Sequence, residues 1–148
     1  MKSLRYTCAA LVVAWAAVAA GCEVFEDQAP KSVSFRMEGA PGDSVAIIFS
    51  KEFLAGTSEA GVTQVRLFGA DTLRRRLPID TVIDVRVERQ LLISAFPESP
   101  GDTVNVTAEV FVDGRNIFDD VGKIYPDNPW IFLYRFNAPP TQSVQIVF

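Results

Sequence analysis

The chain has 148 residues and a formal net charge of −4 at pH 7, from 14 basic and 18 acidic side chains. It contains two cysteines and no histidine. The lack of histidine excludes Ser-His and Cys-His nucleophiles, histidine general bases and the usual zinc sites. The acidic balance argues against nucleic acid as a partner, because phosphate binding depends on a basic surface.

The first 22 residues have the layout of an export signal. Lys2 and Arg5 precede an uncharged stretch, residues 6–20, which ends in small side chains just before Cys22. This stretch is shorter than the roughly 20 apolar residues that a membrane-spanning helix needs, and acidic residues follow it at once. We therefore predict that residues 1–21 form a signal peptide that is removed.

The cleavage site carries the sequence's one family resemblance. Residues 18–22, VAAGC, resemble the lipobox of bacterial lipoproteins, although Ala19 stands where leucine is commonest. The resemblance implies a lipid on Cys22, which becomes the new N-terminus at a membrane of the cell envelope. Glu23 after the cysteine resembles lipoproteins that reach the outer membrane, which we favour. Ordinary cleavage with Cys22 left as a free thiol is the alternative.

The mature chain has the size of one domain. Residues 22–30 predict a short polar tether, about 30 Å long if fully extended at roughly 3.4 Å per residue, and residues 31–148 predict a single domain. Because Cys8 leaves with the signal, the domain has no internal disulfide and depends on packing. The mature part keeps 12 basic and all 18 acidic residues, which gives a net charge of −6.

Hydrophobic side chains after Pro30 recur at every second position, the pattern of a strand with one buried face. Residues 32–38 predict a first strand. After a turn at residues 40–43, residues 45–49 predict a second strand, which is more central because its alternate positions are also partly apolar.

The third predicted strand, residues 62–68, is followed by a predicted turn at residues 69–71. We interpret residues 72–77 as an edge strand that Pro78 ends. Its cluster Arg74-Arg75-Arg76 suits an anionic partner or a lipid headgroup. We favour the simpler interpretation that charges on an exposed edge discourage edge-to-edge aggregation.

Residues 81–96, which precede the clearest strand, predict either one long strand or two shorter ones, and we favour a break. Between residues 81 and 96 the odd positions are apolar except at Arg89, which predicts a break near residues 88–90. A turn at residues 97–102 then leads to residues 103–112, where valine and alanine alternate with residues that are polar except for Phe111.

Residues 113–128 predict a long connection without a strand or helix of its own. Connections of this length usually carry a function or are disordered, and the apolar residues in this one favour order. We predict a partner-contact loop or a loop that closes one end of the domain. Its carboxylates suit Ca²⁺ but lack the spacing of an EF-hand, so we expect no metal. The candidate contact residues are Asn116, Ile117, Phe118, Asp119, Asp120 and Tyr125.

The last predicted strands are residues 130–136 and, beyond two prolines, residues 142–148. Trp130, Phe132, Tyr134 and Phe136 form an aromatic stripe at strand spacing. A carbohydrate or peptide groove is one interpretation, but we favour core packing, since the residues between them are also apolar.

Together these segments predict an all-β fold, an antiparallel β-sandwich with an immunoglobulin-like arrangement and about seven to nine short strands. No glycine-rich phosphate loop or Ser-x-x-Lys spacing is present, and we expect neither an enzyme nor a cofactor. The leading hypothesis is a lipid-anchored binding or accessory module with a protein or glycan partner. The alternatives are a structural subunit of an envelope assembly that uses strand addition, and a carboxylate-based hydrolase.

Overall fold

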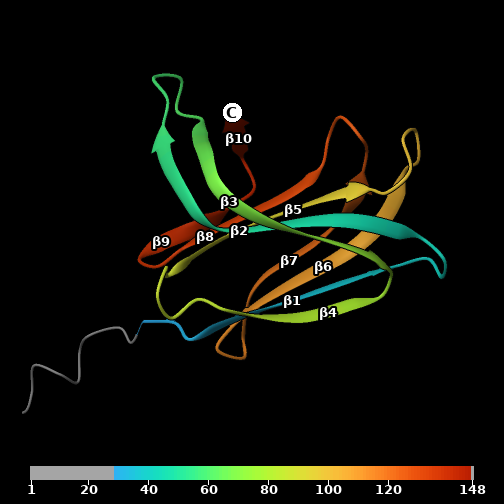
Figure 1. The fold of residues 1–148 in the computed structure, drawn as a ribbon, viewed down its shortest axis with the longest axis horizontal. Coiled ribbons are helices and arrows are strands. Elements are labelled where there is room, and N and C mark those ends of the chain that lie inside the picture. The colour runs from blue at the N-terminus through green and yellow to red at the C-terminus, as the bar shows by residue number, and fades with distance from the viewer. Residues whose placement is uncertain (1–28, 148) are drawn as a thin grey trace, which may run out of the picture.

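The computed structural model describes residues 29–147, which form ten strands in two packed sheets (Figure 1). The predicted signal peptide, Cys22 and most of the predicted tether lie outside the described residues. One sheet has the order β4-β1-β6-β7, from β1 (Ser32–Gly39), β4 (Ile79–Asp84), β6 (Val104–Val112) and β7 (Arg115–Ile124). The other has the order β10-β3-β2-β5-β8-β9, from β2 (Ser44–Thr57), β3 (Thr63–Arg76), β5 (Gln90–Pro97), β8 (Trp130–Arg135), β9 (Ala138–Thr141) and β10 (Val144–Val147).

The predicted all-β sandwich is therefore confirmed. The strands pair antiparallel except β10 and β3, which pair in parallel. The strand order differs from the ABED and CFG sheets of an immunoglobulin constant domain. The likeness to immunoglobulin domains thus lies in the two layers and in connections that pass repeatedly from one sheet to the other.

The main core lies between the two sheets, where alternate side chains of each strand meet. Phe35, Ile47, Leu91 and Phe132 are fully buried there, and the ring centroids of Phe35 and Trp130 are 5.5 Å apart. Tyr134 is buried in the same core, so the prediction that the aromatic stripe packs inside is confirmed for β8.

A second, smaller core covers the opposite face of the six-stranded sheet. It contains Phe53, Val65, Leu92 and Leu133, all at least 96% buried, with Val144 and Ile146 of β10 packed against them. It exists because β2 shifts register beyond Phe49 and because β10 pairs with β3 at Thr63 to Arg66. Figure 1 shows the hairpin of β2 and β3 rising from the sandwich with β10 beside it.

The predicted turn at residues 69–71 is wrong, because β3 runs through these residues without a break. The irregularity falls on β2 instead, where the buried Ser50 donates its hydroxyl to the carbonyl of Gly69. The predicted edge strand at residues 72–77 is confirmed. There β3 pairs with β2 on one side, whereas β10 reaches only as far as Arg66 on the other.

The predicted long loop at residues 113–128 is also wrong. Asp113 and Gly114, both with positive φ, make a tight turn, and β7 then pairs along the whole of β6. The predicted break near residues 88–90 is confirmed, since Arg89 has a φ of 54° between β4 and β5.

Candidate functional site

The six predicted contact residues lie along β7 and the turn after it, and the structure does not gather them on one surface. Ile117 and Phe118 are half-buried against the main core, and the ring of Phe118 lies 5.1 Å from that of Phe132. A bulge explains why two neighbouring residues both face inward, because Val110 pairs with Phe118 and Phe111 with Asn116. These two apolar side chains stabilise the fold.

The polar members of the set have partners within the chain. Asp120 accepts hydrogen bonds from the indole Nε1 of Trp130 at 2.9 Å and from the amide of Gln142 at 2.7 Å. The amide of Asn116 donates to Asp119 at 2.6 Å. Tyr125 is exposed, in a turn closed by a bridge to Asn128. Asp120 thus links β7 to the segments on both sides of β9.

A hollow of about 450 Å³ opens between the two sheets where β3 faces β4, and we call it the edge cleft. Its apolar lining includes the half-buried Phe49, Leu73 and Ile83, and Thr81 faces the same hollow. Lys51 and the exposed Glu52 and Asp71 add charge to the lining. The cleft is therefore an apolar hollow with polar groups of both signs beside it.

Both strands beside the edge cleft are sheet edges. β4 ends the four-stranded sheet, and along residues 71–76 β3 has no outer neighbour within the part of the chain that the structure describes. The unpaired backbone of an edge is a template for another strand. An extended segment paired there can place alternate side chains into an adjoining pocket, which is the geometry of β-strand addition.

The three arginines of β3 lie on this free edge. Arg74, Arg75 and Arg76 are all exposed, and none forms an ion pair with another described residue. Their side chains face solvent on the strand that borders the edge cleft. They therefore make this edge of β3 positively charged, and no acidic side chain within residues 29–147 pairs with them.

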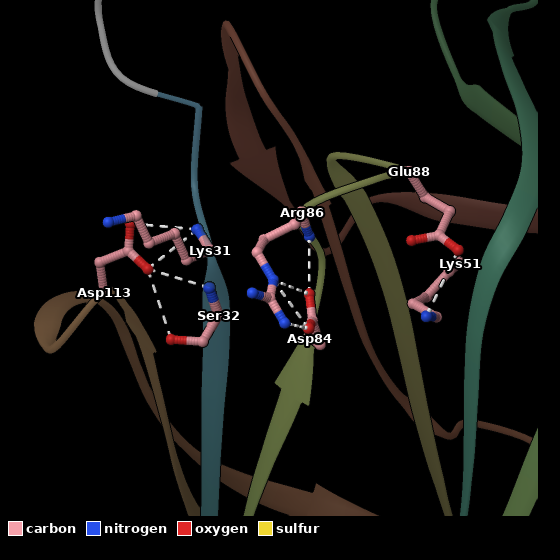
Figure 2. Close-up of polar contacts among 7 residues, drawn as sticks. All are labelled: Lys31, Ser32, Lys51, Asp84, Arg86, Glu88 and Asp113. Carbon is pink, nitrogen blue, oxygen red and sulfur yellow. Dashed lines mark hydrogen bonds and ion pairs between the residues drawn. The ribbon is translucent and has the colours of Figure 1, made fainter.

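A second hollow, of about 840 Å³, lies at the end of the sandwich where the chain enters β1, and its lining includes Lys31, Arg115 and Phe136. Asp113 organises this end (Figure 2): its carboxylate accepts the backbone N–H groups of Lys31, at 3.0 Å, and of Ser32, at 2.9 Å. These bonds, that of Ser32 above all, hold the pKa of Asp113 below its usual value.

Asp84 and Arg86 form a second polar pair at the same end (Figure 2). The guanidinium and the backbone N–H of Arg86 both donate to the Asp84 carboxylate, which lowers its pKa from 3.8 to about 2. Lys51 pairs with Glu88 at 3.4 Å nearby. The acidic side chains of this end are thus already matched by donors or cations.

Within residues 29–147 no three or more Cys, Asp or Glu side chains are grouped so that they could hold a metal ion. No helix among these residues has the length and hydropathy for crossing a membrane.

No protein-family model matches the sequence, and a search of the curated proteins finds no similar chain. Sequence reasoning found the edge at residues 72–77 but missed the edge cleft. Nothing in the alternation of residues says that β3 and β4, which belong to different sheets, face each other across a gap.

Proposed function

We propose that this protein is a non-catalytic, lipid-anchored module of the bacterial cell envelope that binds an extended segment of a protein partner at the edge cleft. The observation that carries the proposal is the position of an apolar hollow between two strand edges, β4 and residues 71–76 of β3, that have no outer neighbour among the described residues. Such an arrangement offers backbone hydrogen bonds and a side-chain pocket to the same ligand.

The charges indicate which segment fits. Exposed Arg74, Arg75 and Arg76 line the free edge of β3. Charge complementarity across an interface favours the right partner and speeds association. The preferred segment is extended, with an apolar side chain for the cleft and acidic side chains beside it.

A protein partner is better supported than a glycan. Flat sugar rings are commonly held on exposed aromatic faces, but Trp130, Phe132 and Tyr134 are buried in the main core. These aromatic side chains pack in the core and therefore offer no exposed face for a sugar ring.

The lipid anchor is supported by the lipobox resemblance at residues 18–22. We expect Cys22→Ser to abolish labelling of the protein with radioactive palmitate and to release it from the membrane fraction. The wild-type chain, processed in the same cells, is the reference. A variant that partitions with membranes as the wild type does would contradict the anchor.

The binding site is tested by one substitution at two neighbouring positions. Thr81 faces the edge cleft, whereas Val82 is 67% exposed on the other face of β4. Thr81→Arg should fill the cleft with an arginine whose charged end can reach water, and should remove the protein partner cross-linked to the wild-type chain in intact envelopes.

Val82→Arg adds the same side chain to the same strand and should leave that cross-link in place. Circular dichroism of both variants checks that they fold. If the Thr81 variant keeps the partner, or if both variants lose it, the edge cleft is not the binding site.

A further inference from the structure

We propose that one end of the sandwich is a docking surface for anionic lipid headgroups. We call it the tether end, formed by residues 30–32, 84–89, 113–116 and 135–137 together with Lys51. The proposal deepens the proposed function, because a lipid on Cys22 would bring this end to a membrane. The charges that support it all lie within the described residues.

Strand register brings these segments together. Ser32 at the start of β1 pairs with Asp84 at the end of β4, and Gln90 at the start of β5 pairs with Arg135 at the end of β8. The backbone N–H of Phe136 donates to the carbonyl of Arg89 at 2.9 Å. Figure 1 shows the start of β1, the β4–β5 connection and the turn after β8 at the end where the chain enters the sandwich.

The tether end is basic on an acidic protein. It carries six basic and three acidic side chains, whereas the rest of residues 29–147 carries six basic and twelve acidic ones. The basic residues of the tether end are Lys31, Lys51, Arg86, Arg89, Arg115 and Arg135, and the acidic residues are Asp84, Glu88 and Asp113.

The three acidic groups do not cancel the exposed positive charge. Arg86 pairs with Asp84 and Lys51 with Glu88, while backbone N–H groups satisfy Asp113. The other four cations form no ion pair with a described residue: Lys31, Arg89, Arg115 and Arg135. A negative surface therefore attracts this end, whereas the rest of the described residues carries a net negative charge and is repelled on balance, which orients the domain.

An exposed apolar residue stands among these cations. Val87 is 85% exposed in the connection between β4 and β5, with Arg86 before it and Arg89 two residues later. The guanidinium of Arg89 lies 5.9 Å from the ring centroid of Phe136. An apolar tip flanked by arginines suits the headgroup boundary of a bilayer, where the side chain leaves water and the cations meet phosphates. This feature favours a lipid surface over an acidic protein.

Vesicle sedimentation tests the proposal on the chain from residue 22 with Cys22→Ser, so that binding cannot come from the attached lipid. The chain should bind vesicles of equal parts phosphatidylglycerol and phosphatidylcholine, more weakly as salt is raised. It should not bind vesicles of phosphatidylcholine alone. Absence of binding to the anionic vesicles, or equal binding to both kinds, would overturn the proposal.

Paired double variants separate position from net charge. Lys31→Glu with Arg115→Glu should weaken binding by about tenfold or more, since each basic residue at a membrane surface contributes several-fold in affinity. Arg66→Glu with Lys123→Glu changes the net charge equally at exposed positions away from the tether end, and should keep binding within about twofold of the parent chain on the same basis. Equal losses in the two double variants would show a non-specific charge effect and overturn the proposal.

The apolar tip has its own control. Val87→Asp should weaken binding, whereas Val82→Asp, at an exposed position on the outer face of β4, should not. Binding to soluble polyglutamate as tight as to the anionic vesicles would reassign the surface to acidic polypeptides. Because the lipid anchor is tested separately by palmitate labelling, it can stand when this docking surface fails.

Discussion

Asp113 fixes both the turn before β7 and the entry of the chain into β1. Its φ of 47°, followed by 80° at Gly114, fits a two-residue hairpin turn in which both central residues adopt positive φ. Its carboxylate also accepts the backbone N–H groups of Lys31 and Ser32 and the hydroxyl of Ser32. One side chain thus joins two segments that are about 80 residues apart in sequence.

We expect Asp113→Ala to lower the free energy of unfolding by about 1 kcal/mol, less than a buried hydrogen bond to a charged group because both partners are exposed. Asp113→Asn should cost less, since asparagine tolerates positive φ and keeps an acceptor oxygen. Urea unfolding of the two variants measures the difference. Equal losses would show that the carboxylate charge, rather than the turn geometry, carries the effect.

The pair of Asp84 and Arg86 gives a prediction about pH. Because the folded pKa of Asp84 is lowered from 3.8 to about 2, its contribution to stability is present above pH 4 and is lost as the pH falls from about 4 to 2. Arg86→Ala removes the guanidinium, which is the largest cause of the shift, but leaves a backbone donor at residue 86. The pKa of Asp84 should therefore rise to between 2 and 3.8 in a carboxyl NMR titration. An unchanged value would contradict the assigned cause.

At the scale of elements, the sequence predicted strands well wherever the alternation was undisturbed. β6 was predicted to within one residue of its observed start because apolar and polar residues alternate along it as far as Val110. β7 was missed because its inward positions include Asp120 and Gly122, and because the bulge at Ile117 shifts the pattern by one residue. The pair Asp113-Gly114 was the signal that could have revealed it, since Asp-Gly is a strong hairpin marker.

β5 is one of the strands that contribute to both cores, with Leu91 in the main core and Leu92 in the second. We expect Leu92→Ala to cost about 2–5 kcal/mol, because the side chain is fully buried and its removal leaves a cavity. Val82→Ala, at an exposed position, should change stability by less than about 0.5 kcal/mol. Thermal or urea unfolding compares them, and a mild effect at Leu92 would mean that the second core contributes little.

At the scale of the whole molecule, periodicity predicted the two-layer fold but not how separate strands meet. The edge at residues 72–77 followed from Pro78, yet the edge cleft depends on β3 and β4 facing each other, and the tether end depends on four segments meeting at one end. These are facts of three-dimensional register. The net negative charge follows from the sequence alone. The concentration of basic side chains at the tether end becomes visible only when the strands are placed.

The parallel pairing of β10 with β3 has a consequence for the order of events during folding. The side chains of Gln64 and Gln145, which are 81 residues apart in sequence, form a hydrogen bond. β1 likewise pairs with β6, which follows much later in the chain. Strands this distant in sequence pair slowly, because the chain loses the entropy of closing a long loop before any stabilising contact forms. A chain made from its N-terminus therefore exposes Val65, Leu92 and Leu133 until residues 144–147 have been synthesised. The unfinished chain is thus the species most prone to aggregation, and its protection rests on the arrival of the last described strand.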